Sequence, residues 1–158
     1  MNRYAVRLNT VAVVCENFEP RGKDGNYLGK HADMPESSAK LIADLLATVD
    51  QDVETFGFLA LDSRHHVIGF KLLTLGTHNQ APVDVAKLFR VALALGACGL
   101  IVFHNHPSND LEPSRDDIDL TTRLVAGGRV IGIAVHDHII AGIPGRWLSL
   151  RSARPNIF

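Results

Sequence analysis

The stretch FHNHPSNDLEPSRDD at residues 103–117 decides how this chain is interpreted. His104 and His106 stand at the end of an apolar run that is typical of a buried strand. Side chains two residues apart on a strand share one face, so both imidazoles would point the same way. Ser114 and Asp117 would open the next helix, which can fold the carboxylate back over the imidazoles. Two imidazoles and one carboxylate are a typical ligand set of catalytic zinc sites, in which water takes the fourth position.

Each of these features also has an ordinary structural explanation. Two histidines at the end of a strand are more often exposed or hydrogen-bonded than bound to metal. Ser114 and Asp117 fit a capping box, in which the hydroxyl accepts a backbone N–H and the acid complements the helix dipole. The conjunction of all these residues within fourteen positions is what favours a metal-hydrolase site.

The pattern H-x-H, seven residues, Ser, two residues and Asp resembles the signature of RadC-like proteins. These belong to the JAB/MPN+ (JAMM) group of metalloprotease-like domains. The resemblance covers about residues 35–150 and implies an α/β fold, the three-layer cytidine-deaminase-like (JAB/MPN) sandwich with a mixed central sheet. Besides the histidine run it takes in the segments PESSA, ETFG, GT and DHII at residues 35–39, 54–57, 76–77 and 137–140.

The resemblance also implies a zinc site and a function. One Zn²⁺ per chain would be bound by His104, His106 and Asp117. The metal would lower the pKa of a bound water and polarise the scissile carbonyl. The implied activity is hydrolysis of amide or isopeptide bonds by a metallopeptidase of the JAMM type. Its substrate would be a peptide or protein, with an isopeptide-linked tail as one form.

Two further roles are carried over from the family. Glu54 occupies the position of the general base, fifty residues upstream of the first histidine. From the residues alone Glu54 would be a solvated carboxylate at a strand end. Glu112 ranks second, because it lies inside the spacer of the motif. The Ser114 hydroxyl would donate to the oxyanion of the tetrahedral intermediate, a role that competes with helix capping.

Length and charge leave room for two other functions, which rank behind the hydrolase. The 158 residues, 46% of them hydrophobic, suffice for one compact core but are short for two. A net charge of −1 and a pI near 6.7 provide no chain-wide basic field for nucleic acid. The helix-hairpin-helix segment that longer relatives carry is not recognisable, which disfavours a DNA-repair-associated accessory protein. A catalytically silent MPN scaffold is disfavoured because all five site residues are present. Nothing in the sequence indicates the oligomeric state.

The cysteines and the first residues indicate a cytoplasmic protein without membrane contact. Cys15 and Cys98 lie far apart and form no C-x-x-C, so neither a disulfide framework nor a thiolate zinc site is expected. The apolar run at 11–14 is too short for a signal-peptide core or a membrane span.

Two other positions near the motif carry expectations. A second H-x-H at residues 136–138 has no carboxylate after it at ligand spacing, so a role beside the metal ligands or at a strand edge is favoured over a second metal. Asn109 stands where many relatives have glycine. We expect a left-handed backbone there, which asparagine tolerates better than other non-glycine residues.

Hydrophobic periodicity and turn residues predict one mixed α/β unit. Residues 1–34 would form an N-terminal strand and loop, taken as part of the domain at 35–158 or as a separate segment. The strand is expected at 4–14 and the loop, as the most mobile segment, at 19–33. Helices are expected at 35–48, 82–96 and 115–126, the last stopped by two glycines at 127–128. Strands are expected at 54–61 and 67–75 as a hairpin, at 99–103, and at 130–135, 138–141 and 147–150.

Overall fold

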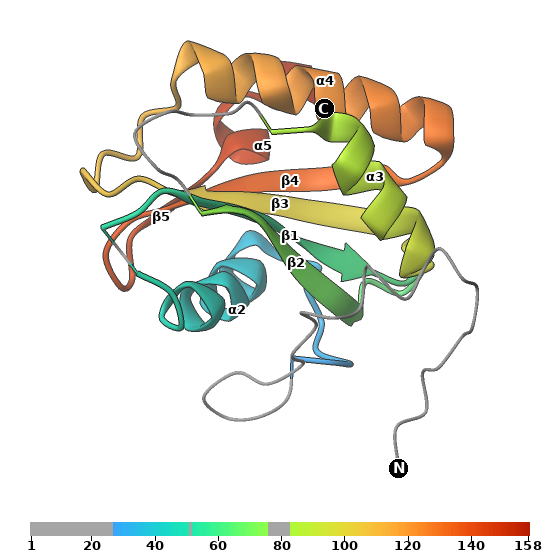
Figure 1. The fold of residues 1–158 in the computed structure, drawn as a ribbon, viewed down its shortest axis with the longest axis horizontal. Helices are drawn as coiled ribbons and strands as arrows, with labels where there is room; N and C mark the ends of the chain where they lie inside the picture. The colour runs from blue at the N-terminus through green and yellow to red at the C-terminus, as the bar shows by residue number, and fades with distance from the viewer. Residues whose placement is uncertain (1–26, 51, 76–82) are drawn as a thin grey trace.

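The computed structural model describes residues 27–50, 52–75 and 83–158 (Figure 1). The described strands form a mixed sheet in the order β2-β1-β3-β4-β5, in which β3 and β4 are parallel and the other neighbours antiparallel. None of the helices in these ranges is both long and apolar enough to cross a membrane. The elements, in chain order, are α2 (Pro35–Leu46), β1 (Thr55–Leu61), β2 (Val67–Leu75), α3 (Val85–Ala94), β3 (Gly99–Asn105), α4 (Arg115–Ile131), β4 (Ala134–Ala141), β5 (Trp147–Ser149), α5 (Leu150–Ala153) and the 3₁₀ helix η1 (Pro155–Ile157).

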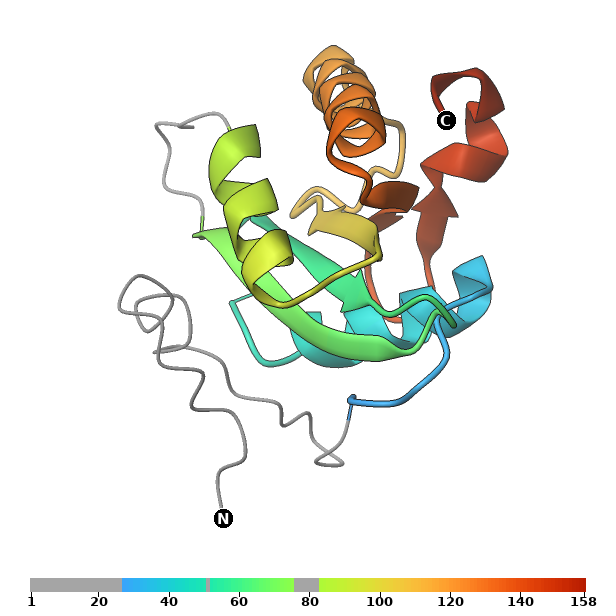
Figure 2. The same cartoon turned by 90° about the vertical axis from the view of Figure 1, so that its right-hand side faces the viewer.

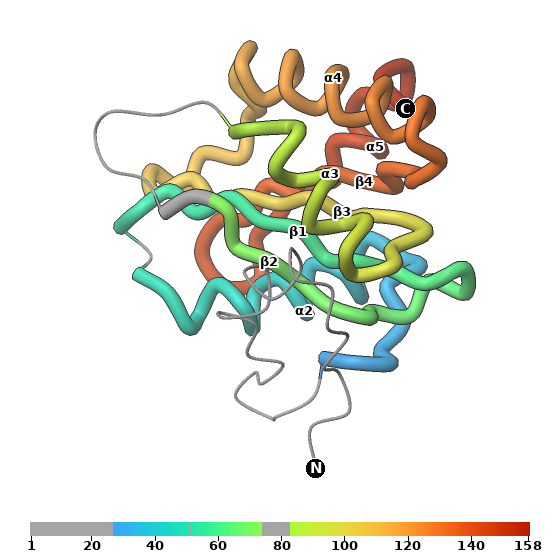
Figure 3. The backbone as a smooth tube through the Cα atoms, turned by 45° about the vertical axis from the view of Figure 1, so that its right-hand side comes forward, coloured from blue at the N-terminus to red at the C-terminus, as the bar shows by residue number. Residues whose placement is uncertain are grey.

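Helices cover both faces of the sheet, which gives three layers (Figure 2, Figure 3). On one face, Leu59 and Phe103 belong to the core cluster that includes α2. On the other face, Phe58 and Val102 belong to the cluster that includes α3 and α4. Because alternate side chains are buried on opposite faces, β1 and β3 are buried along their whole length. The predicted three-layer α/β architecture with a mixed central sheet is confirmed.

Helix α4 is longer than the sequence predicts. Its pattern predicts a stop at Gly127 and Gly128, but the helix continues to Ile131 and ends at Gly132, whose φ of 83° is left-handed. Gly128 does not end the helix but allows the backbone at Ile133 to pack closely against it. A Cβ at residue 128 would lie 2.3 Å from the carbonyl oxygen of Ile133. The predicted helix end is therefore wrong. A glycine that lets two backbone segments pack closely cannot be distinguished by sequence from a glycine that ends a helix.

The extension of α4 also changes the strands that follow. The strands predicted at 130–135 and 138–141 are one strand, β4, which starts only at Ala134. The strand predicted at 147–150 ends at Ser149, whose side chain caps α5 by accepting a hydrogen bond from the Ser152 amide. The hairpin predicted between β1 and β2 is confirmed.

The first described residues pack against the main core. Tyr27 and Ala32 are buried in the cluster that includes α2, and His31 forms an isolated β-bridge with His66. The strand predicted at 4–14 and most of the loop predicted at 19–33 lie outside the described residues.

We expect Gly128→Ala to destabilise the fold. Alanine normally stabilises a helix interior by about 1 kcal/mol relative to glycine. Here the added methyl group would overlap the Ile133 carbonyl, and such overpacking costs about 1–3 kcal/mol. Urea unfolding should show a clear loss relative to Val130→Ala, which alters a side chain 89% exposed on the same helix. Equal free energies of unfolding for the two variants would contradict this packing.

Candidate metal centre

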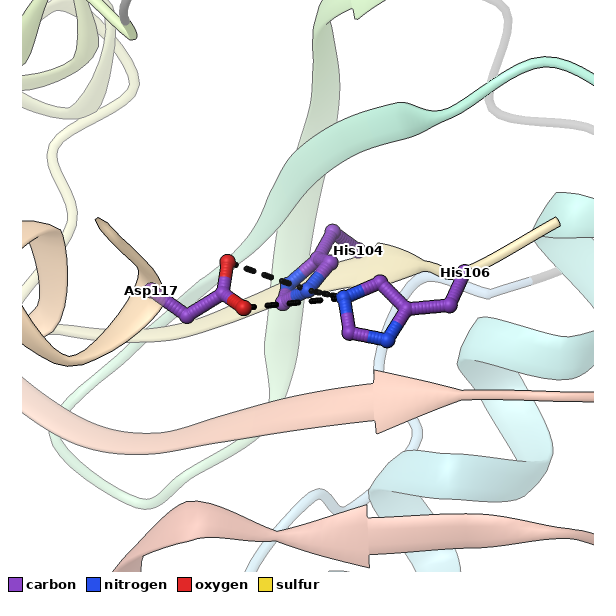
Figure 4. A group of neighbouring side chains, drawn as sticks. All are labelled: His104, His106 and Asp117. Carbon is purple, nitrogen blue, oxygen red and sulfur yellow. Dashed lines mark hydrogen bonds and ion pairs between the residues drawn. The ribbon is translucent and has the colours of Figure 1, made fainter. Parts of the chain in front are cut away.

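The side chains of His104, His106 and Asp117 meet where β3 ends and α4 begins (Figure 4). Each offers one ligand atom, and these atoms lie within 4.8 Å of one another. Asp117 Oδ1 is 3.3 Å from His104 Nε2, and Asp117 Oδ2 is 3.5 Å from His106 Nε2. Across the ranges that the structure describes, no other group of three or more His, Cys, Asp or Glu side chains converges in this way. The cluster predicted from the spacing can hold a metal ion.

Ser114 begins α4 and orients the Asp117 carboxylate. Its Oγ accepts a hydrogen bond from the Asp117 amide at 3.1 Å and donates one to Asp117 Oδ2 at 2.6 Å. The Ser114 amide donates to the same oxygen at 2.8 Å. These bonds are those of a capping box. The role of Ser114 toward an oxyanion stays a prediction, and it requires the hydroxyl proton to turn away from Asp117.

The loop between β3 and α4 fixes the second imidazole. Asn109 has a φ of 59°, as expected for this position, and its amide donates to the carbonyl of His106 at 2.9 Å. His106 Nδ1 lies 2.5 Å from the carbonyl oxygen of Asp110. Because a carbonyl only accepts, Nδ1 carries the proton in this bond. In neutral His106 the lone pair is therefore on Nε2, the atom that faces the cluster.

The cluster favours a positive charge among its three side chains. His104 Nε2 and His106 Nε2 lie 2.8 Å apart, beside the Asp117 carboxylate. Lone pairs and a carboxylate this close repel one another unless a proton or a cation lies between them. The residues present therefore fit a cation, because the two Nε2 atoms and the Asp117 oxygens lie so close together.

The pKa shifts follow from the same electrostatics. The hydrogen bond to Asp117 raises the pKa of His106 above its ordinary value. Burial alone would raise the pKa of Asp117, but the neighbouring His104 and His106 imidazoles outweigh this effect and hold that pKa well below its ordinary value. The carboxylate is thus ionised, and a metal would compete with a proton for Nε2 of His106.

Glu54 lies immediately before β1, the strand that pairs with β3. Phe56 is the antiparallel partner of His104, so the same register continued by two residues brings Glu54 to the level of His106. The charge of Glu54 is one of the causes that raise the pKa of His106. The structure thus brings Glu54 near the cluster but not into the ligand set. Its role as base stays a prediction.

Asn105, between the two histidines, has a role that sequence reasoning missed. Its Oδ1 accepts from the Thr55 amide at 2.7 Å, and its Nδ2 donates to the Val53 carbonyl at 3.1 Å. The two bonds hold the backbone on both sides of Glu54. A signal for this exists in the sequence, since an asparagine at a buried strand position must find hydrogen-bond partners.

The second H-x-H contributes one histidine to the surroundings of the cluster. His138 Nε2 lies 2.8 Å from His104 Nδ1, and burial lowers the pKa of His138 well below its ordinary value. Asp137 instead accepts from the Ser149 hydroxyl at 2.6 Å, and burial raises its pKa. His136 packs against the ring of His65, with centroids 4.6 Å apart. The three residues therefore have three different environments.

Comparison with known proteins agrees with this geometry. A family model described as RadC-like JAB domain matches residues 32–155. A UPF0758 protein of Desulforamulus reducens is 41% identical over 118 residues, which cover 75% of this chain and 51% of the relative. A UPF0758 protein of Thermosynechococcus vestitus is 40% identical over 119 residues, covering 75% and 46%. One of Clostridium perfringens is 36% identical over 141 residues, covering 89% and 60%. The chain spans about half the length of the first two relatives.

Proposed function

Because the chain belongs to the RadC-like JAB domain family, we propose that it is a zinc-dependent hydrolase of amide or isopeptide bonds. The JAB-domain family includes hydrolases. The observation that carries the proposal is the convergence of His104, His106 and Asp117 with their ligand atoms within 4.8 Å of one another. DNA-associated and catalytically silent roles are outcomes of the tests below.

Zinc is the metal that suits this donor set. Two imidazole nitrogens and one carboxylate oxygen are borderline and hard donors, a combination common in catalytic zinc sites with three protein ligands. A zinc ion bound there would lower the pKa of water and polarise the scissile carbonyl. His104 is buried while the His106 side chain keeps 17% of its surface exposed, so the substrate would approach from the side of His106.

Glu54 would act as general base and then as general acid in the hydrolysis. It takes a proton from the attacking water as the new C–O bond forms and delivers it to the leaving nitrogen as the C–N bond breaks. The products are a carboxylate and an amine. Asn105 supports this role, because its two hydrogen bonds hold the backbone on both sides of Glu54. The Ser114 hydroxyl would then donate to the oxyanion, in place of its bond to Asp117.

The proposal is tested on the purified full chain, with zinc measured by elemental analysis and activity measured on a panel of peptides joined by lysine isopeptide bonds. We expect about one zinc per chain, cleavage by the zinc-loaded protein, and loss of cleavage after chelation that added zinc restores. A chain that takes up no zinc contradicts the proposal. A zinc-loaded chain that leaves every probe intact favours the silent scaffold, and tight, salt-sensitive DNA binding in a gel shift would favour the accessory role.

A further inference from the structure

We propose that Thr121 and His138 are positioning residues that set the tautomer of His104 and so turn a lone pair on its Nε2 toward the metal. The relevance to catalysis rests on the proposed function. The hydrogen-bond arrangement itself does not, because it is a property of the metal-free chain.

The contacts form a continuous chain beneath the cluster. His104 Nδ1 lies 2.8 Å from His138 Nε2, and His138 Nδ1 lies 2.6 Å from Thr121 Oγ1. Thr121 Oγ1 lies 2.5 Å from the carbonyl oxygen of Asp117, one helical turn earlier. His138 and Thr121 are 0% exposed and His104 is 1% exposed. Water therefore has no access through which to exchange these partners.

The carbonyl of Asp117 determines which atom donates in each of these hydrogen bonds. A backbone carbonyl only accepts, so the single proton of the Thr121 hydroxyl goes to Asp117. The hydroxyl can then only accept from His138, whose Nδ1 must carry the proton. A neutral His138 with a proton on Nδ1 has a lone pair on Nε2, and this lone pair accepts from His104. The proton of neutral His104 is thus on Nδ1, and Nε2 is left as a metal ligand.

Hydrogen bonds donated in the opposite direction would leave His104 Nε2 unable to bind a metal. If Thr121 donated to His138 instead, then His138 Nε2 would carry a proton and donate it to His104 Nδ1. Neutral His104 would then hold its proton on Nε2, the atom 3.3 Å from Asp117 Oδ1, and a protonated nitrogen cannot bind a metal. The orientation of the Thr121 hydroxyl on α4 therefore determines whether His104 Nε2 on β3 has a lone pair for a metal.

Helix α4 also provides a matched pair of threonines. Thr121 and its neighbour Thr122 both donate to the carbonyl four residues earlier, at 2.5 and 2.8 Å. Thr122 is exposed, and the bond that its hydroxyl donates to Ile118 stays within the helix. Thr121→Val and Thr122→Val thus remove the same kind of helix bond and add the same side chain. Only the first removes the partner of His138.

The first readout is the tautomer of His104 in the metal-free protein, from long-range ¹H–¹⁵N correlation, with the signal assigned by its loss in His104→Ala. We expect the proton on Nδ1 in the wild type, in Thr121→Ser and in Thr122→Val, and a mixture of tautomers in Thr121→Val. A proton on Nε2 in the wild type would overturn the proposal. The wild-type tautomer needs no variant at position 121, so it can overturn the proposal even if Thr121→Val fails to fold.

The second readout is the zinc dissociation constant of the same four proteins by competition with a chelating dye. We expect Thr121→Val to bind zinc about 10-fold more weakly, at the lower end of the range for direct partners of metal-bound histidines, because Thr121 acts on His104 only through His138. Thr121→Ser and Thr122→Val should match the wild type. Equal affinity of Thr121→Val and the wild type would overturn the proposal. A wild type that binds no zinc would refute the proposed function, and the tautomer would then decide this inference alone.

Discussion

Replacing Glu54 by glutamine is expected to abolish hydrolysis while the zinc content stays unchanged. The amide cannot take a proton from water at neutral pH, and general acid–base catalysis contributes about 10²–10⁴-fold to turnover. Zinc binding should persist because Glu54 is not among the three ligand residues. The measurement is turnover of an isopeptide probe that the wild type cleaves, beside elemental analysis of the same samples.

Glu112→Gln is the matched control for this prediction. Glu112 is the other candidate base in the motif, but it is exposed and pairs with Arg154 at 3.6 Å. We expect its removal to leave both turnover and zinc content near the wild-type values. Full activity of Glu54→Gln would refute the mechanism, and loss of activity in Glu112→Gln alone would exchange the roles of the two residues.

Asp117→Ala is expected to lower the zinc content from about one per chain to near zero. The substitution removes the one carboxylate that lies against both imidazoles, at 3.3 and 3.5 Å. Metal that binds only the folded state stabilises it, by about 2.7 kcal/mol at a concentration one hundred times the dissociation constant. Added zinc should therefore raise the thermal midpoint of the wild type but not of Asp117→Ala.

The neighbouring Asp116→Ala controls for the helix. Asp116 is exposed and lies in the same first turn of α4, so its removal costs a similar interaction with the helix dipole. It should keep its zinc and its zinc-dependent stabilisation. His104→Ala should behave like Asp117→Ala. Metal retained in both ligand variants would return Ser114 and Asp117 to helix capping alone.

The ligand cluster could be predicted because its residues belong to one local unit. His104 lies near the end of β3, His106 directly follows the strand, and Asp117 lies in the first turn of the next helix, so spacing alone indicates that they converge. Glu54 is different. It joins the site only through the antiparallel pairing of β1 with β3, which local sequence does not specify, so only the family resemblance indicates it.

The partners of His104 could not be predicted for a related reason. His138 lies beside His104 because β4 pairs in parallel with β3, with a register shift between Leu100 and Ile101. Thr121 lies on α4, which packs against this face of the sheet. Local patterns contain neither the order of strands nor the shift. The end of α4 is not predictable from local sequence for the same kind of reason, since Gly128 is required by the close approach of the Ile133 carbonyl and not as a helix terminator.

The side chain of Asn105 has a consequence for how this site can diverge. It ties the start of β1, next to the predicted base, to the end of β3, next to the two histidines, through bonds to Val53 and Thr55. The separation between Glu54 and the histidines is therefore set by the sheet, and exposed side chains of the turn that do not hold His106, such as Glu112, have no part in it. In the proposed hydrolase, substitutions at such positions can alter which substrates bind while the chemical step keeps its geometry. Substrate preference and reactivity are thus free to change separately in this architecture.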